Sequence, residues 1–471
     1  MQNRAFCIHG HFYQPSREDP LTGLIPQEKG AEPYHNWNER INAYCYLPNA
    51  QLGNFEKISF NLGPTLNRWM EKNSADTLSL ITAAEKKSYT RWKISNAMAQ
   101  SYHHTILPLA TRRDKVTQVR WGISDYLHTY GHAPAGMWLP EAAVDLETLS
   151  VLAENQIKFT ILAPWQAETP VDITHPYRVE LPGGKSIIVF FYQKELSTCI
   201  SFDQNSTSNA DQFVKNCLCG NYSQTDEDQI IIAASDGELY GHHQPFRDKF
   251  LNYLLNGALT QQDLEYTFPA KWLQDHEVKQ EVKIRENTSW SCMEGVLRWS
   301  GECSCTPDGR WKKPLRDLMD KTACLVDEQF EMTASDWLKD PWQARDDFAE
   351  VFIGDIPFDS WLAGNEKRQL SENETLRLRQ LMNGQIERQR MFTSCGWFFE
   401  DFDRIEPRNN VRYAAHALVL TQVASGHELI SQIADVLKPV YSHQTTATAE
   451  EVFNQAIRRF KENSGSTSFA S

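Results

Sequence analysis

The sequence predicts an α/β fold, either a parallel βα barrel or a doubly wound sheet, followed by an α-helical C-terminal region. Short apolar runs recur through the first 240 residues, each followed by a loop and helix-like sequence. Several runs are apolar on both faces and rich in Ile, Val and Phe, as buried parallel strands tend to be. Strands that alternate with helices over this length favour these two architectures. After about residue 285 the strand-like runs stop and apolar residues recur at helical spacing.

Six or seven strands are expected, a number that leaves room for an incomplete barrel. The runs that predict them cover residues 5–8, 58–62, 136–139 (a weaker case), 158–163, 186–192 and 229–234. Between strands, Asp145 is a plausible N-cap for a helix that carries Leu146, Leu149 and Leu152 on one face.

The C-terminal region carries its own helix signals. Ser371 with Glu374, and Thr448 with Glu451, are spaced as capping boxes ahead of apolar residues at helical spacing. Residues 412–424 also predict a helix. We therefore expect a barrel domain over residues 1–285 and an α-helical domain over residues 286–471.

Bulk properties are those of an ordinary globular protein. The 471 residues are 41% hydrophobic and 23% charged, with a formal net charge of −14. An acidic chain without a basic face argues against nucleic acid as a partner, whereas a neutral sugar is compatible with it. The N-terminus does not resemble a signal peptide and no run is long enough for a membrane span, so a cytoplasmic protein is expected. The sequence leaves the oligomeric state open.

Two histidine-rich motifs stand out in the first 110 residues, and the first of them follows an expected strand. The first is His9-Gly10-His11-Phe12-Tyr13-Gln14-Pro15, directly after the first run. Alternating histidines at a strand end can bind sugar hydroxyls or a metal, or they can be buried structural residues. The second, Tyr102-His103-His104-Thr105-Ile106-Leu107-Pro108, is a weaker signal because adjacent helical residues face different ways.

Two carboxylates stand where apolar runs end. Glu141 closes Gly136-Met137-Trp138-Leu139-Pro140-Glu141, and Asp236 opens the polar segment Asp236-Gly237-Glu238-Leu239-Tyr240-Gly241-His242-His243. Catalytic side chains collect at the carboxyl ends of barrel strands, and a pair of acids is what cleavage of a glycosidic bond needs. Trp138 beside the acid offers a flat apolar face to a sugar ring, although a core Trp with a surface Glu is an equally common arrangement.

Other sequence features are weaker evidence for a functional site. Cys292, Cys303 and Cys305 fit no common structural zinc spacing, so reduced thiols and no metal are the expectation. The segment 393–400, with Trp397, could supply an aromatic sugar subsite, but such a stripe is more often core packing. Phosphate-binding glycine loops and a serine nucleophile elbow are absent from the sequence.

In order along the chain, the motifs that begin at His9, Gly136 and Ser235 resemble those of glycoside hydrolase family 57, whose members are retaining enzymes acting on α-glucans. The resemblance covers roughly residues 1–285, and the wider sequence, including Trp290-Ser291-Cys292 and residues 392–399, is similar to a poorly characterised subgroup of that family with an α-helical C-terminal region. It departs from the family pattern in the first motif, lengthened by Phe12 and Tyr13, and in the second, where only residues 102–108 hint at the usual sequence.

The resemblance implies an incomplete seven-stranded βα barrel with a helical region that closes the cleft. It implies Glu141 as nucleophile, Asp236 as general acid/base and no cofactor. The activity would be of α-amylase, 4-α-glucanotransferase or branching-enzyme type on an oligo- or polysaccharide. The expected substrate-binding residues are His9, His11, Gln14, His104, Trp138, Glu238, His242, His243 and Trp397.

Two other functions compete with this one. A metal-dependent hydrolase, similar to a polysaccharide deacetylase or a zinc mannosidase, could use His9, His11, Asp236, His242 and His243 as ligands. A catalytically inactive carbohydrate-binding protein would need neither Glu141 nor Asp236.

Overall fold

A computed structural model of the chain describes residues 3–464 and divides into two compact units. The first takes in the chain up to Ser16, then Pro26–Tyr102 and Gly122–Trp290. The second takes in Arg17–Ile25, His103–Trp121 and the chain from Ser291 onward. Two short N-terminal segments therefore pack with the C-terminal half of the chain rather than with their neighbours in sequence.

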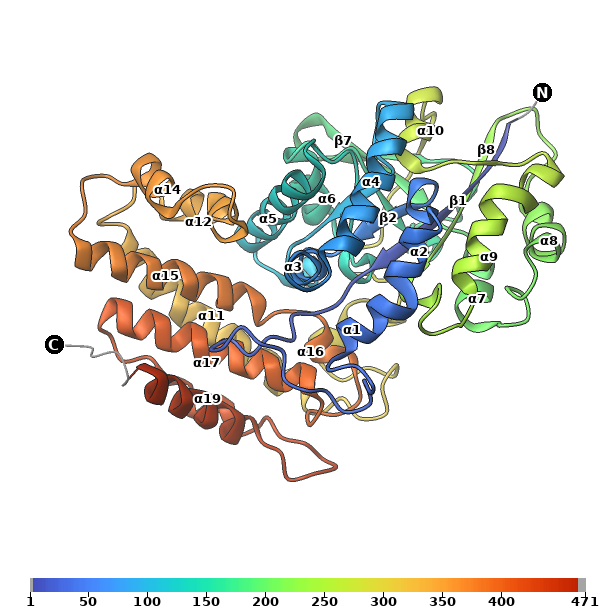
Figure 1. The fold of residues 1–471 in the computed structure, drawn as a ribbon. Helices are drawn as coiled ribbons and strands as arrows, with labels where there is room; N and C mark the ends of the chain where they lie inside the picture. The colour runs from blue at the N-terminus through green and yellow to red at the C-terminus, as the bar shows by residue number, and fades with distance from the viewer. Residues whose placement is uncertain (1–2, 465–471) are drawn as a thin grey trace. The chain divides into compact units, whose positions relative to one another are not determined.

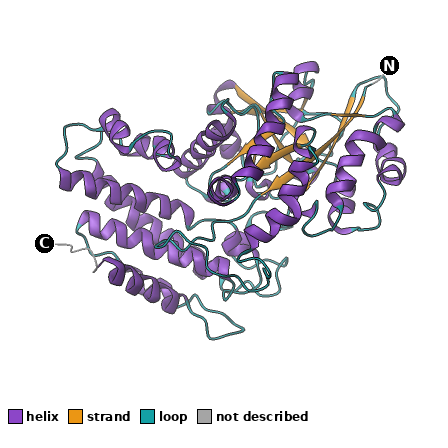
Figure 2. Ribbon diagram, viewed as in Figure 1, coloured by secondary structure: helices purple, strands orange, loops and turns teal. Residues whose placement is uncertain are grey.

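All the named strands of the described residues belong to the first unit (orange in Figure 2). They are β1 (Arg4–Phe12), β2 (Ser59–Leu62), β3 (Ala97–Gln100), β4 (Met137–Trp138), β5 (Phe159–Leu162), β6 (Tyr177–Leu181), β7 (Lys185–Phe191), β8 (Gln229–Asp236), β9 (Glu265–Tyr266) and β10 (Gln280–Glu281).

Seven of these strands follow one another in parallel. One sheet has the order β4-β3-β2-β1-β8, and a bridge between Gly136 and Phe159 continues it from β4 to β5, which pairs with β7. After β7, the amide of Gln193 donates to the carbonyl of Ile232 in β8 over 2.7 Å. The predicted α/β fold with a parallel sheet is confirmed, and this succession of strands is consistent with an incomplete seven-stranded barrel.

All six predicted strand segments lie on strands of the sheet. The sequence did not reveal β3, which is only Ala-Met-Ala-Gln and lacks β-branched residues, or β6. β6 pairs antiparallel with β7 as a hairpin and stands outside the succession of seven parallel strands.

Alternation along the strands decides which side chains face the interior. On β1, Ala5 and Cys7 belong to an apolar cluster that also contains Ile230, Ile232 and Ala234 of β8. Because successive residues of a strand point to opposite faces, the next members of these two rows are His9 and His11 on β1 and Asp236 on β8. The parallel register pairs His11 with Asp236 and confirms that the two rows end together. In Figure 1, β1 and β8 lie side by side.

The helices of the first unit connect and flank these strands. They are α1 (Trp37–Ile41), α2 (Leu47–Gln51), α3 (Pro64–Asn73), α4 (Ala75–Trp92), the C-terminal part of α5 (Arg112–Tyr130), α6 (Leu146–Glu154), α7 (Lys194–Phe202), α8 (Ala210–Gln212), α9 (Arg247–Tyr253) and α10 (Pro269–Asp275). The predicted N-cap of α6 is present, since the Asp145 carboxylate accepts from the amide of Thr148.

The second unit is helical, as predicted for the C-terminal region. It contains the N-terminal part of α5 with α11 (Lys312–Ala334), α12 (Pro341–Asp347), α13 (Ala349–Ile353), α14 (Phe358–Asn365), α15 (Glu372–Arg390), α16 (Cys395–Phe398), α17 (Ile405–Ser425), α18 (Ala434–Leu437) and α19 (Ala449–Ser464). α17 packs against α11, α15 and α19 (Figure 1). The capping box of Ser371 and Glu374 opens α15. No described helix combines the length and the apolar character that a membrane crossing requires.

Candidate active site

His9 and His11 are buried at the carboxyl end of β1 and bound to polar side chains of the neighbouring strand. The His9 ring contacts the Ser59 hydroxyl at 2.9 Å through Nδ1 and the Asn61 amide oxygen at 3.3 Å through Nε2. Nδ1 of His11 lies 3.2 Å from the same amide oxygen. Burial lowers the pKa of His9 to about 3, with His11 adding to the effect, and burial lowers that of His11 to about 4. Both rings are therefore neutral at physiological pH.

Aromatic rings surround these histidines. Trp138 of β4 stacks on His9 and His11, with ring centroids 4.7 and 5.3 Å away. Trp290 meets Trp138 edge-on at 5.0 Å and also contacts His11 and Tyr192. Trp138 is fully buried, so the surface offered to a ligand comes from the half-buried Trp290 rather than from Trp138.

Glu141 lies in a tight turn directly after β4. The turn, Pro140–Ala142, places both Glu141 (φ 57°) and Ala142 (φ 47°) in the left-handed region, which is unusual for residues with a side chain. Trp290 binds Glu141 twice. Its indole N–H donates to Oε2 of the carboxylate at 3.0 Å, and its amide donates to the Glu141 carbonyl at 2.9 Å.

Asp236 ends β8 and is accessible to solvent, yet protein atoms surround its carboxylate closely. Desolvation, followed by the charges of Glu238 and Glu141, raises the pKa of Asp236 to about 8. The upward direction follows from the two neighbouring carboxylates alone, because a like charge disfavours ionisation. The structure thus brings together the two acids that the sequence singled out, within electrostatic reach of each other.

Glu238 is buried and holds the loop that follows β1. Its Oε1 accepts from the Tyr46 hydroxyl at 2.6 Å and from the Tyr13 amide at 3.1 Å, and the Gln14 side chain also hydrogen-bonds to it. Burial raises the pKa of Glu238 to about 7. These contacts make Glu238 and Gln14 supports of the site in this structure, beneath the residues that can meet a ligand.

His242 and His243 stand at the edge of this region. Their amides both bind the Glu238 carbonyl, at 3.1 and 3.0 Å. His243 is exposed and His242 is half-buried, with Trp37 edge-on to its ring at 6.0 Å. Partial burial lowers the pKa of both rings, to about 4 for His242.

The other two expected site residues, His104 and Trp397, belong to the second unit. His104 is buried and its Nδ1 lies 2.6 Å from the Ser394 hydroxyl. Trp397 is fully buried on α16, and its indole donates to the Lys312 carbonyl at 3.2 Å. In this structure Trp397 therefore packs in a core. Core packing was the alternative to a sugar subsite for the segment 393–400.

Sequence reasoning did not include Trp290, Tyr192 and Asn61 among the site residues. Trp290 stands in a polar loop after the last strand, and its signals in the sequence were an aromatic residue in such a loop and the resemblance of the segment Trp290-Ser291-Cys292 to a family subgroup. Asn61 and Tyr192 lie at or just after the carboxyl ends of β2 and β7, two strands that the sequence did predict, so the barrel-end rule could have included them.

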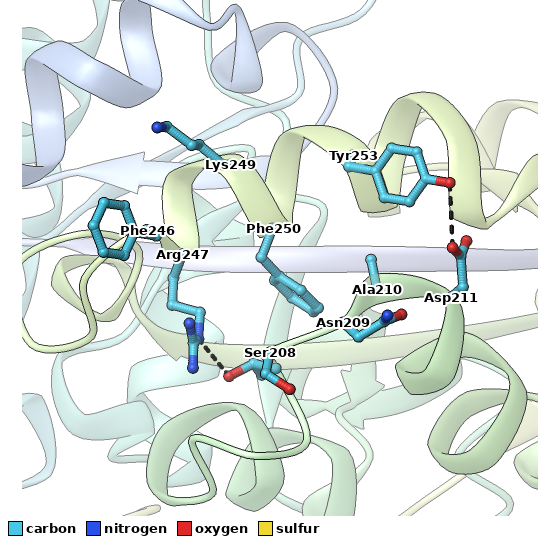
Figure 3. Close-up of a pocket in the computed structure, with 10 residues that line it drawn as sticks. Ser208, Asn209, Ala210, Asp211, Phe246, Arg247, Lys249, Phe250 and Tyr253 are labelled. Carbon is cyan, nitrogen blue, oxygen red and sulfur yellow. Dashed lines mark hydrogen bonds between the residues drawn. The ribbon is translucent and has the colours of Figure 1, made fainter.

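A separate cavity of about 350 Å³ lies between α8 and α9 (Figure 3). Arg247 closes one side of it through its bond to the Thr207 hydroxyl, and the Tyr253 hydroxyl contacts Asp211 on the other. None of the expected site residues lines this cavity, so it is distinct from the carboxylate pair.

Comparisons with known proteins agree with this architecture. Residues 25–285 match the family model of glycosyl hydrolase family 57, and residues 308–465 match a domain of unknown function, DUF3536. No curated protein matches the chain.

Several solved structures share the fold at low identity. The exo-type maltose-forming amylase from Pyrococcus sp. ST04 is 14% identical with a TM-score of 0.71, over 96% of this chain and 88% of that one. The branching enzyme from Pyrococcus horikoshii is 15% identical with a TM-score of 0.57, over 97% of this chain and 94% of that one. The 4-α-glucanotransferase from Thermococcus litoralis is 15% identical with a TM-score of 0.59, over 90% of this chain, which spans only 60% of that protein. Because the family model covers more than half of the sequence, the chain belongs to glycosyl hydrolase family 57.

Proposed function

We propose that this protein is a retaining glycoside hydrolase or transglycosylase that acts on α-glucans or related oligosaccharides, with Glu141 as nucleophile and Asp236 as general acid/base. One observation carries the proposal: two carboxylates from the ends of β4 and β8 lie close enough that the charge of Glu141 raises the pKa of Asp236. A retaining mechanism needs two carboxyl groups about 5 Å apart, one ionised and one protonated.

In the first step, Asp236 donates its proton to the glycosidic oxygen while the Glu141 carboxylate attacks the anomeric carbon. The bond to the leaving sugar breaks, and a glycosyl ester forms on Glu141. The raised pKa of about 8 keeps Asp236 protonated at neutral pH, as this step requires.

In the second step, Asp236 takes a proton from water or from a sugar hydroxyl, which attacks the ester and releases Glu141. Esterified Glu141 no longer carries a charge, so the pKa of Asp236 falls and its carboxylate becomes available as a base. The same pair of residues can therefore supply both proton transfers.

The substrate class rests on the family and on the names of the similar structures. These are a maltose-forming amylase, a branching enzyme and a 4-α-glucanotransferase; the first name refers to maltose and the last to an α-glucan. Neutral His9 and His11 can exchange hydrogen bonds with sugar hydroxyls, and Trp290 offers an aromatic face to a sugar ring. Water as acceptor would make the activity of amylase type, whereas a second sugar as acceptor would make it of 4-α-glucanotransferase or branching-enzyme type.

Chemical rescue tests the roles of the two acids. Glu141→Ala should lose at least about 10³-fold in kcat, because the covalent step is gone. Sodium azide should restore turnover of an activated α-glucoside and give a glycosyl azide of inverted configuration. Asp236→Ala with azide should instead give a product of retained configuration. Glu147→Ala, an exposed carboxylate on α6, is the matched control and should keep wild-type activity. Full activity of either acid variant would overturn the assignment.

The metal-hydrolase alternative loses support from the geometry of its ligand set. In the described part of the chain, the groups of His, Cys, Asp and Glu whose ligand atoms lie close enough to share an ion amount to one cluster of three cysteines. The proposed zinc ligands His9, His11, Asp236, His242 and His243 do not form such a cluster. An oligosaccharide that binds but is never cleaved or transferred would instead favour the inactive binding protein.

A further inference from the structure

Three cysteines of the second unit converge on one point. Cys292 and Cys303 are buried, Cys305 is half-buried, and all three sulfur atoms lie within 4.8 Å of one another. The Cys305 thiol points at the sulfur of Cys292 over 3.7 Å. All three are reduced cysteines, so the fold rather than a disulfide holds the cluster together.

We propose that Cys292, Cys303 and Cys305 bind one zinc ion as thiolates. A zinc–sulfur bond of about 2.3 Å in tetrahedral geometry places two sulfur atoms about 3.8 Å apart. The 3.7 Å between Cys292 and Cys305 matches this spacing, whereas a disulfide needs sulfur atoms about 2.05 Å apart.

The charges around the sulfurs support an anionic site. Lys312 is fully buried at the start of α11, and its Nζ donates to the hydroxyl of Thr306, which in turn lies 3.5 Å from the sulfur of Cys303. Arg298 is also buried, and its guanidinium hydrogen-bonds to Cys305 and to the carbonyls of Ser291 and Phe398.

Neither of these cations forms an ion pair with a carboxylate among the residues that the structure describes. Buried Lys and Arg are rare without a partner of opposite charge. One zinc ion with three thiolates carries a net charge of −1, which supplies that partner, while three neutral thiols do not. Three protein ligands leave the fourth position to a water molecule, on the side of half-exposed Cys305.

The position in the chain suggests what the ion stabilises. The segment between Ser291 and Trp311 contains one short helix, Leu297–Trp299, and otherwise turns and loop before α11 begins. Such a segment has few regular backbone hydrogen bonds. A zinc ion bound by Cys292, Cys303 and Cys305 would stabilise it through metal–sulfur bonds instead. Cys292 also follows Trp290 by two residues in sequence, so the zinc would fix the end of the segment that positions Glu141.

Metal analysis of the full-length chain tests the proposal. Protein purified without chelators or metal-affinity resin should contain one equivalent of zinc by plasma mass spectrometry. Cobalt(II) exchanged into the site should show intense thiolate-to-metal charge-transfer bands in the near ultraviolet. Cys303→Ser should lose the zinc, while Cys324→Ser, an exposed cysteine on α11, should keep it.

Thiol counting keeps the test decisive if Cys303→Ser fails to fold. Wild-type protein treated with a strong chelator should expose three additional thiols to a thiol reagent, and added zinc should protect them again. Metal-free wild-type protein with an unchanged Tm after zinc addition would overturn the proposal. So would a Cys292–Cys305 disulfide found by mass spectrometry, or one equivalent of a different ion. Each of these results is independent of whether Glu141 and Asp236 cleave a sugar.

Discussion

Trp290 is the residue that fixes the orientation of Glu141. Its indole N–H binds the carboxylate and its amide binds the carbonyl of the same residue. A carboxylate with one oxygen bound to a donor presents the other toward the anomeric carbon in a defined direction. We therefore regard Trp290 as a positioning residue of the proposed mechanism.

Trp290→Phe should lower kcat by about 10- to 100-fold, because the variant keeps the aromatic ring but loses a hydrogen bond to a charged group, of about 1.5–3 kcal/mol. KM should change less than kcat. Steady-state kinetics on an α-glucan substrate measures both. Trp92→Phe, at the end of α4, is the control and should leave kcat unchanged. Equal kcat values in the two variants would contradict the role of Trp290.

The basic limb of the pH profile should report Asp236. A general acid works only when protonated, so kcat/KM should fall as the pH rises through about 8. Glu238→Gln keeps an oxygen acceptor for Tyr46 but removes a negative charge beside Asp236. The pKa of Asp236 should then fall, and the limb should move about one pH unit lower. Glu147→Gln should leave the limb in place, and an unmoved limb in Glu238→Gln would contradict the coupling.

At the scale of elements, α5 packs so closely on β3 that only glycine fits at one position. A Cβ added to Gly122 would overlap the carbonyl oxygen of Gln100, a backbone atom that cannot rotate away. Gly364 on α14 has no neighbour within 4 Å of the corresponding position. The two glycines are both helical but differ in their surroundings.

Gly122→Ala should therefore lower the free energy of unfolding by about 2–3 kcal/mol, through overpacking. Gly364→Ala should raise it by about 0.5–1 kcal/mol, because alanine favours the helix and nothing obstructs it. Urea unfolding followed by circular dichroism measures both changes. The same sign of change in both variants would contradict the contact between α5 and β3.

Elements with strong local patterns were predictable from sequence, and those defined by their partners were not. The strands β1, β7 and β8 are long apolar runs, and α6 and α15 carry caps that are visible in the sequence. β3 has only four residues, none of them β-branched, and becomes a strand because β2 and β4 pair with it. The site follows the same rule. Glu141 and Asp236 follow apolar runs, whereas Trp290 joins them only through the fold.

At the scale of the whole molecule, a buried group of charges links four helices of the second unit. Asp114 of α5 lies 3.1 Å from Arg345 of α12 and 2.9 Å from Arg388 of α15, and Arg388 also binds Asp327 of α11 at 2.7 Å. From sequence, the helical domain is expected to begin near residue 286. In the structure, the second unit also includes residues 103–121. No local pattern reveals this, because the partners of Asp114 lie more than 200 residues away.

Asp114→Asn should lower the free energy of unfolding by about 3–5 kcal/mol, since it removes a buried negative charge and leaves two buried guanidinium groups to share Asp327. Burial acts to raise the pKa of Asp114, but Arg388 and Arg345 hold it well below its usual range. Its stabilisation is therefore present above about pH 4 and is lost as the pH falls further. Asp317→Asn, which removes an exposed ion pair with Lys313, should cost under about 1 kcal/mol. Urea midpoints at pH 7 and pH 3 measure the difference, and equal midpoints for the two variants at pH 7 would contradict the network.

The left-handed turn at Glu141 and Ala142 has a consequence for how the chain can evolve. Each non-glycine residue in that conformation costs of order 1 kcal/mol, and glycine would remove the cost. That strain favours glycine at position 141, but Glu141→Gly also removes the hydrogen bond from the Trp290 indole to the carboxylate, so the variant should be inactive and gain at most about 1 kcal/mol in stability. A lineage that keeps glutamate at this position is being selected for the carboxylate itself.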